Sequence, residues 1–199
     1  MVSLKYGTVY SIQNGYNAWN GGYLDTRGSG CQDNYLCVST AESSNRTKSV
    51  SNPNGASTAS WQILSAQNKQ PGQPVVNGDV IYFLNMYKGS TGNGGYLDTR
   101  GSGCADNLLC VSTSADQDRP DTDGSTTKWR IIADSPSPEG QVQTDSLVHL
   151  LNGWNDWQGG FLDTRGSGCQ DNYFCVSTTP TWQRDTGSTH WRFYEELSS

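Results

Sequence analysis

Residues 21–40 read GGYLDTRGSGCQDNYLCVST, and two further stretches nearly repeat them: GGYLDTRGSGCADNLLCVST at 94–113 and GGFLDTRGSGCQDNYFCVST at 159–178. Sixteen of the twenty positions are identical in all three copies, and the others vary as Tyr/Tyr/Phe, Gln/Ala/Gln, Tyr/Leu/Tyr and Leu/Leu/Phe. Such identity within one chain indicates three copies of one supersecondary unit. Because each third is small for a core of its own, we predict one domain over 1–199 with repeats 1–72, 73–138 and 139–199.

Each repeat contains four short apolar or alternating runs separated by turn residues, which is typical of strands. The expected strands are 9–12, 23–27, 35–39, 60–64, 80–84, 96–100, 108–112, 129–132, 148–151, 161–165, 173–177 and 191–194. No window keeps a 3.6-residue period, so essentially no helix is expected. Twelve strands in three repeats predict an all-β fold, a β-trefoil with pseudo-threefold symmetry. Strands one and four of each repeat would form a six-stranded barrel, and strands two and three a cap of hairpins. A β-prism has the same strand count and is the alternative.

The fourth strand of each repeat begins with a tryptophan, Trp61, Trp129 or Trp191. An apolar residue follows each at i+2, so both side chains lie on one face of the strand. We predict that these three tryptophans belong to the core.

Charge and hydropathy exclude several classes of protein. The formal net charge is −6, with no cluster of Lys and Arg that would indicate a nucleic-acid binder. No run of 18 apolar residues predicts a membrane-spanning helix. The first residues, MVSLKYGTVY, lack the apolar segment of a signal peptide.

Six cysteines form three pairs at one spacing: Cys31/Cys37, Cys104/Cys110 and Cys169/Cys175. An even number at a fixed spacing favours three local disulfides, and these would favour a secreted or extracellular location. Each bridge would close a short loop, for a chain-entropy gain of roughly 2 kcal/mol. The alternative is six buried free thiols in a cytosolic protein. No histidine accompanies the pairs, so no metal site is predicted, and no cofactor.

The repeated stretch resembles the ricin-B-type carbohydrate-binding β-trefoils. That family repeats a Leu-Asp-Val-x-Gly element, which Leu24–Gly28, Leu97–Gly101 and Leu162–Gly166 resemble, and a Gln-x-Trp, whose Trp corresponds to Trp61, Trp129 and Trp191. The chain departs from the family at that Gln, where Ala59, Thr127 and Thr189 stand, and in its local cysteine pairs and longer repeats. The resemblance implies sugar binding by Asp25, Asp98 and Asp163, and galactose or N-acetylgalactosamine as the sugar.

Two interpretations remain open for the charged residues of the hairpin, the three aspartates above and Arg27, Arg100 and Arg165. Asp and Arg at i and i+2 share one face of a strand. They either pair with each other and with the turn, or they face a ligand, where carboxylates accept from sugar hydroxyls and guanidinium groups donate.

The loop between the paired cysteines carries an Asp-Asn pair in every copy, and this pair also has two interpretations. Asp-Asn is ordinary turn chemistry, but a disulfide-stiffened loop with a carboxylate and an amide is also a preorganised polar site. The candidates are Gln32, Asp33, Asn34, Tyr35, Asp106, Asn107, Gln170, Asp171, Asn172 and Tyr173.

Repeats one and three share a Gly-aromatic-Asn-x-Trp-amide motif, at 15–20 and 153–158, that repeat two lacks. Its Trp19 and Trp157 lie in polar loops, where an exposed ring stacks on the apolar face of a sugar. The alternative is a small apolar cluster beneath the loop.

A multivalent lectin explains the threefold repetition of polar residues best, with its glycan sites at the hairpins and the sites of repeats one and three strongest. An enzyme is not expected, because the chain has no nucleophile motif and its two histidines are unrepeated. The alternative is a protein-interaction β-trefoil, a protease inhibitor or a toxin's receptor-binding module acting through loops such as 41–59 and 114–126.

Overall fold

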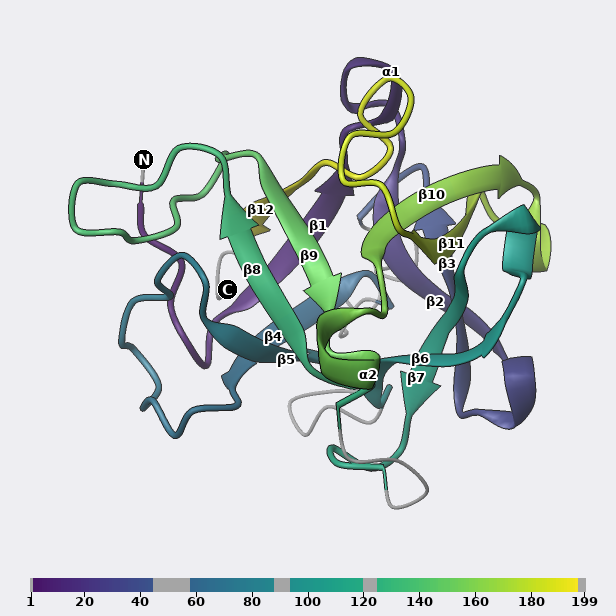
Figure 1. Cartoon of the computed structure of the whole chain (residues 1–199), viewed down its shortest axis with the longest axis horizontal. Coiled ribbons are helices and arrows are strands. Elements are labelled where there is room, and N and C mark those ends of the chain that lie inside the picture. The colour runs from purple at the N-terminus through teal and green to yellow at the C-terminus, as the bar shows by residue number, and fades with distance from the viewer. Residues whose placement is uncertain (1, 45–57, 88–93, 120–124, 197–199) are drawn as a thin grey trace, which may run out of the picture.

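A computed structural model describes residues 2–44, 58–87, 94–119 and 125–196, and the described residues form all twelve expected strands (Figure 1). Each lies within about two residues of its predicted bounds. The strands are β1 (Val9–Asn14), β2 (Tyr23–Ser29), β3 (Leu36–Ala41), β4 (Ser60–Ser65), β5 (Val80–Asn85), β6 (Tyr96–Ser102), β7 (Leu109–Ser114), β8 (Trp129–Ala133), β9 (Val148–Asn152), β10 (Phe161–Ser167), β11 (Phe174–Thr179) and β12 (Trp191–Glu195).

Strands one and four of each repeat close into a six-stranded antiparallel barrel. The pairs are β1–β4, β4–β5, β5–β8, β8–β9, β9–β12 and β12–β1. The closed order leaves no free edge in the barrel.

The second and third strands form the hairpins β2–β3, β6–β7 and β10–β11, which cap one end of the barrel (right in Figure 1). The third strands also pair with one another around the symmetry axis, as β3–β7, β7–β11 and β11–β3. This arrangement is the β-trefoil, as predicted.

The core lies inside the barrel and beneath the cap. Trp61, Trp129 and Trp191 are completely buried, and each indole Nε1 donates to the carbonyl of the leucine in its own repeat's hairpin, at 2.8–2.9 Å. The same indole therefore fills the barrel and ties the hairpin to it. The prediction that these tryptophans are core residues is confirmed.

The open end of the barrel is closed by three strand-like segments. Leu4, Val75 and Val142 are fully buried there and exchange backbone hydrogen bonds in a ring, with N···O distances of 2.8–2.9 Å. The ring repeats the threefold symmetry of the cap at the opposite end.

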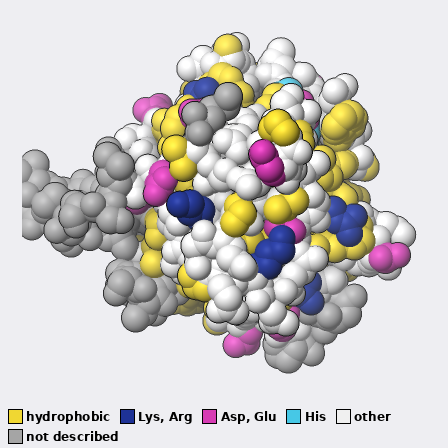
Figure 2. Space-filling model, turned by 90° about the vertical axis from the view of Figure 1, so that its left-hand side faces the viewer, with side chains coloured by type: hydrophobic (Ala, Val, Ile, Leu, Met, Phe, Trp, Pro, Cys, Tyr) yellow, Lys and Arg dark blue, Asp and Glu magenta, His cyan; other side chains and the backbone are white. Residues whose placement is uncertain are grey.

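Helix is confined to short turns. α1 (Tyr16–Trp19) and α2 (Trp154–Trp157) each have two middle residues with positive φ, and three 3-10 turns, η1 (Cys31–Asp33), η2 (Cys104–Asp106) and η3 (Cys169–Asp171), lie between the paired cysteines. No helix within the described ranges is long and apolar enough to cross a membrane. On the face seen in Figure 2, charged side chains of both signs lie scattered among polar and apolar ones.

We predict that Trp129→Ala lowers the free energy of unfolding by about 3–5 kcal/mol, because it leaves a large cavity and an unpaired carbonyl on Leu97. Urea denaturation followed by circular dichroism measures the change. The matched control is Trp154→Ala in α2, whose side chain is 40% exposed and whose loss should change stability by less than about 1 kcal/mol. Equal losses for both variants would contradict this account of the core.

Candidate functional site

The aspartates of the three hairpins are completely buried between repeats. The Nδ2 of Asn172 donates to Asp25 at 2.8 Å, Asn34 donates to Asp98 at 2.7 Å, and Asn107 donates to Asp163 at 2.8 Å. Each asparagine also donates to a serine of the same neighbouring hairpin: Ser39, Ser112 or Ser177. The Asn of one cysteine loop is thus bonded to the Asp of the next repeat, in a closed ring of three.

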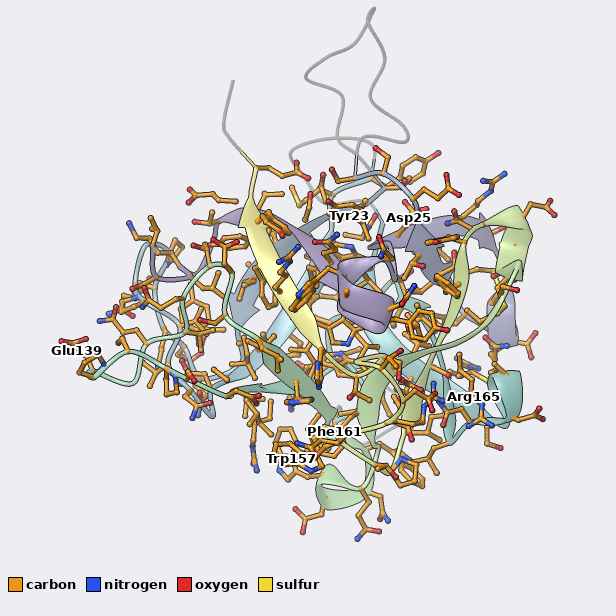
Figure 3. All side chains as sticks on the ribbon, turned by 90° about the horizontal axis from the view of Figure 1, so that it is seen from above. Tyr23, Asp25, Glu139, Trp157, Phe161 and Arg165 are labelled. Atoms are coloured by element: carbon orange, nitrogen blue, oxygen red, sulfur yellow. A yellow bond between two sulfur atoms is a disulfide. The ribbon has the colours of Figure 1, made fainter. Side chains whose placement is uncertain are left out.

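The prediction that Asp25, Asp98 and Asp163 face a sugar does not fit this burial. A carboxylate with no exposed surface cannot accept a bond from a ligand hydroxyl, so the structure favours the alternative, a structural role. Figure 3 labels Asp25 beside Tyr23 of the same strand. The asparagines Asn34, Asn107 and Asn172 are committed to the same network.

Burial raises the pKa of Asp98 and of Asp163 above the usual range of an aspartate. The charge of Arg119 and the hydrogen bond from Asn34 oppose the rise at Asp98, and the hydrogen bonds from Arg184 and Asn107 oppose it at Asp163. Removing such donors would leave a buried charge uncompensated.

The backbone of each cysteine loop also forms a hydrogen bond with the neighbouring repeat. All six cysteines are paired within their repeats, as predicted: Cys31–Cys37, Cys104–Cys110 and Cys169–Cys175. The backbone N–H of Tyr35, Leu108 and Tyr173 donates to the third strand of the next repeat at 2.8–2.9 Å. The cysteine loop thus joins two repeats. This role differs from both predictions for its Asp-Asn pair, a local turn and a sugar site.

The variable Tyr/Leu/Tyr position packs over a glycine of the following copy. A Cβ added to Gly95 would meet the ring of Tyr35 at 2.9 Å, and the pairs Leu108/Gly160 and Tyr173/Gly22 repeat this contact. Each of these glycines has φ of about +80°, so both space and backbone conformation require glycine there. The rings of Tyr35 and Tyr173 therefore have a packing role, although Tyr35 is 42% exposed.

The remaining polar residues of the cysteine loops lie on the surface. Asp33, Asp106 and Asp171 are exposed, with φ between 52° and 55°. Gln32 and Gln170 are also exposed, and Gln32 Nε2 lies 3.4 Å from the sulfur of Cys104. With Ala105 they surround a basin of about 170 Å³ on the threefold axis, lined by the three disulfides.

The arginines of the hairpins, unlike the aspartates, line clefts. The β10 cleft, of about 250 Å³, lies between the turn of β10 and the aromatic loop α1, and its lining includes Tyr16, Arg165, Ser167, Phe174, Arg184 and Asp185. The β6 cleft, of about 350 Å³, lies between the turn of β6 and α2, and its lining includes Arg100, Ser102, Leu109, Arg119, Thr126 and Trp154. Each cleft combines a hairpin of one repeat with an aromatic loop of the next.

The hairpin β2–β3 of repeat one carries Arg27 at the equivalent position, and Tyr87 of repeat two is the counterpart of Tyr16 and Trp154. Tyr87 follows Asn85 as Tyr16 follows Asn14, and Tyr87 N–H donates to Asn85 Oδ1 at 3.1 Å, as Tyr16 does to Asn14 at 3.0 Å. The rest of that loop, including 89–93, lies outside the described residues.

The second arginine of each cleft was missed in the sequence. Arg184 donates from Nε to Asp163 at 2.8 Å and from Nη2 to the carbonyl of Thr164 at 2.7 Å, and Arg119 Nη1 lies 3.6 Å from Asp98. A signal existed, since Arg119 and Arg184 each follow the second cysteine of their copy by nine residues. Arg46 has the same spacing after Cys37 but lies outside the described residues.

The predicted loop tryptophans, Trp19 and Trp157, are half-buried beneath arginines of the barrel. The guanidinium of Arg192 lies 4.1 Å from the ring centroid of Trp19, and that of Arg130 lies 3.9 Å from that of Trp157. Cation–π stacking therefore occupies one face of each indole. The aromatic side chains that line the clefts are instead Tyr16 and Trp154, three residues earlier in the same motif. Figure 3 labels Trp157 and Arg165 at well-separated places.

No group of three or more potential metal ligands gathers anywhere within the described ranges. The two histidines, which belong to different segments, are neighbours, with 5.1 Å between the ring centroids of His149 and His190. Burial lowers the pKa of both, which favours the neutral form.

No family model and no curated protein matches the chain in sequence. Solved structures match it in fold. The SDF2-like protein of Arabidopsis thaliana is 16% identical with a TM-score of 0.67, and the match covers 98% of this chain and 96% of that one. The botulinum neurotoxin serotype D binding domain is 14% identical with a TM-score of 0.61, covering 98% of this chain and 42% of that one.

A second serotype D structure, the ligand-binding domain in complex with N-acetylneuraminic acid, is 16% identical with a TM-score of 0.59, covering 98% of this chain and 42% of that one. At such identities the likeness establishes the fold, and it agrees with the β-trefoil topology of the strands.

We predict that Asn172→Ala lowers the free energy of unfolding by about 1.5–3 kcal/mol, because it removes a hydrogen bond to the buried carboxylate of Asp25. The control is Asp171→Asn on the same loop, an exposed position whose positive φ an asparagine tolerates, and it should change stability by less than about 0.5 kcal/mol. Chemical denaturation with the disulfides intact measures both. An unchanged midpoint for Asn172→Ala would show that the ring of Asn–Asp bonds does not hold the repeats together.

Proposed function

We propose that the protein is a multivalent carbohydrate-binding protein, a lectin, whose glycan sites are the β6 cleft and the β10 cleft. The observation that carries the proposal is that one arrangement occurs twice. Each cleft offers an arginine from the repeated stretch, a serine hydroxyl from the same turn and an aromatic ring from the next repeat.

These groups suit a sugar ring. An aromatic face stacks on the apolar C–H face of a pyranose, while guanidinium and hydroxyl groups bond to its oxygens. Trp154 is 40% exposed and Tyr16 is half-buried, so both have surface left for a ligand. With volumes of about 350 and 250 Å³, the clefts are at or below the lower end of the usual range for small-molecule sites, a size that suits one terminal sugar of a glycan.

A rigid frame surrounds each cleft. The hairpin is bonded to the neighbouring repeat through its buried aspartate, and Arg184 is fixed by two hydrogen bonds under the β10 cleft. Because weak polar contacts must outweigh the desolvation of a sugar, side chains that are already ordered improve affinity.

Since each cleft spans two repeats, the motif missing from repeat two affects the hairpin of repeat one. We therefore propose two main sites, at the hairpins of repeats two and three, and a weaker third at Arg27 and Tyr87, in place of the expectation that the hairpins of repeats one and three are strongest and that of repeat two weakest. Two sites on one chain give avidity on a surface dense with glycans. The surface residues of the cysteine loops, Asp33, Asp106 and Asp171, are secondary candidates for contacts to an extended glycan.

The sialic-acid complex of the toxin domain supports sugar binding on this fold in general terms. Three disulfides support a secreted protein or one of an oxidising compartment. Galactose and N-acetylgalactosamine, which the ricin-like resemblance implies, are the first sugars to test.

We predict that the protein binds a defined subset of a glycan array and that calorimetry with the best monovalent sugar finds two sites per chain. Trp154→Ala and Tyr16→Ala should each weaken one of the two sites by at least about fivefold, since the loss of a stacking ring costs about 1 kcal/mol, and more where the ring also shapes the cleft.

The control is Trp182→Ala, an equally exposed tryptophan (46%) outside both clefts, which should leave the two sites intact. A flat array would refute the lectin proposal, and inhibition of a protease in a standard panel would favour the protein-interaction alternative.

A further inference from the structure

We propose that the clefts select an acidic sugar residue, and that Arg165 in the β10 cleft binds its anionic group. This inference rests on the proposed function and names the class of sugar that the same clefts take.

Arg165 is available to form hydrogen bonds with a ligand. Among the described residues, nothing forms a hydrogen bond or an ion pair with its guanidinium, although the side chain is half-buried and lines the cleft. Arg184 beside it is already bonded to Asp163, Asp185 and a backbone carbonyl. Arg184 therefore has a structural role in the β10 cleft, and the donors of Arg165 are available to a ligand.

The hydrogen-bonding groups of the β10 cleft also indicate the kind of ligand. Binding of a neutral sugar relies on side-chain carboxylates or amides that accept bonds from vicinal hydroxyls. Here the hairpin carboxylate, Asp163, is completely buried and turned to Asn107 and Arg184. The lining of the cleft offers the guanidinium donors of Arg165 and the hydroxyls of Ser167 and Tyr16, which both donate and accept, while its carboxylate, Asp185, pairs with Arg184. Donors of this kind match a ligand rich in acceptors, and a planar guanidinium matches a carboxylate with two parallel bonds.

Both clefts contain two arginines and an aromatic side chain. The β6 cleft places Arg100 and Arg119 beside Trp154, and no carboxylate is among the described residues that line it. The described carboxylates that pair with arginines of the clefts are Asp98 with Arg119, and Asp163 and Asp185 with Arg184. In the β10 cleft these carboxylates pair with Arg184, and the described residues offer no ion-pair partner to Arg165.

The experiment compares sugars that differ in one group. Methyl galactoside, methyl galacturonide and galactose 6-sulfate are titrated into the full chain by calorimetry, at low and at high salt. We expect the two acidic sugars to bind at least about fivefold more tightly than the neutral one, and added salt to reduce that difference. Comparing the affinities for methyl galacturonide and for galactose 6-sulfate shows whether the clefts prefer a carboxylate or a sulfate.

Three variants assign the effect. Arg165→Gln should remove the preference at one of the two sites, and Asp185→Asn should strengthen acidic binding there about twofold or more. Lys5→Gln, an exposed cation outside both clefts, is the control that loses the same charge and should change nothing. Thermal unfolding checks that each variant is folded.

The outcomes separate this inference from the proposed function. Equal or tighter binding of the neutral galactoside, or an acidic preference that Arg165→Gln leaves unchanged at both sites, would overturn the inference and leave the lectin proposal standing. No binding of any sugar here and on the array would refute the proposed function itself.

Discussion

The hydrogen bond from the cysteine-loop asparagine of one repeat to the buried hairpin aspartate of the next is the interaction on which the structure depends. It occurs three times, in a ring that has no first member: Asn34 to Asp98, Asn107 to Asp163, and Asn172 to Asp25. A buried carboxylate is costly unless donors surround it, so no repeat can form its hairpin in the native way without its neighbour. The disulfide of each loop holds the asparagine in place for this bond.

The same ring determines where the two clefts form. Because the aspartates point inward, the outer surface of each hairpin is left with its arginine and serine. Because the repeats interlock, the aromatic loop of the next repeat comes to lie beside that surface. The clefts are therefore products of assembly, and a single repeat would contain only half of each.

Much of the fold could be predicted from the sequence, because the signals that set it are local. The threefold copy of twenty residues, the alternation of apolar residues and the tryptophan of every fourth strand led to the correct strands, the barrel and the core. The disulfides followed from spacing alone.

The site could be predicted only in part, because burial in the cap depends on contacts between repeats. On an isolated strand, Asp25 and Arg27 share a face, and nothing local shows that one is covered by Asn172 while the other lines the surface. The stacking of Trp19 under Arg192 joins residues from opposite ends of the chain, so its ring could not be distinguished from a ligand platform. Arg119 and Arg184, at a constant spacing after the cysteines, were detectable in the sequence and were overlooked.

We propose that sugars bind between repeats, with the clefts as the main sites and neither the buried hairpin aspartates nor the cysteine loops as the primary contact. A crystal structure of the protein soaked with methyl galacturonide tests it most directly. The account predicts sugar in the β10 cleft, with its carboxylate within hydrogen-bond distance of Arg165 and its ring against Tyr16, and a second sugar beside Trp154. Sugar bound at Asp33, Asp106 or Asp171 with both clefts empty would contradict it.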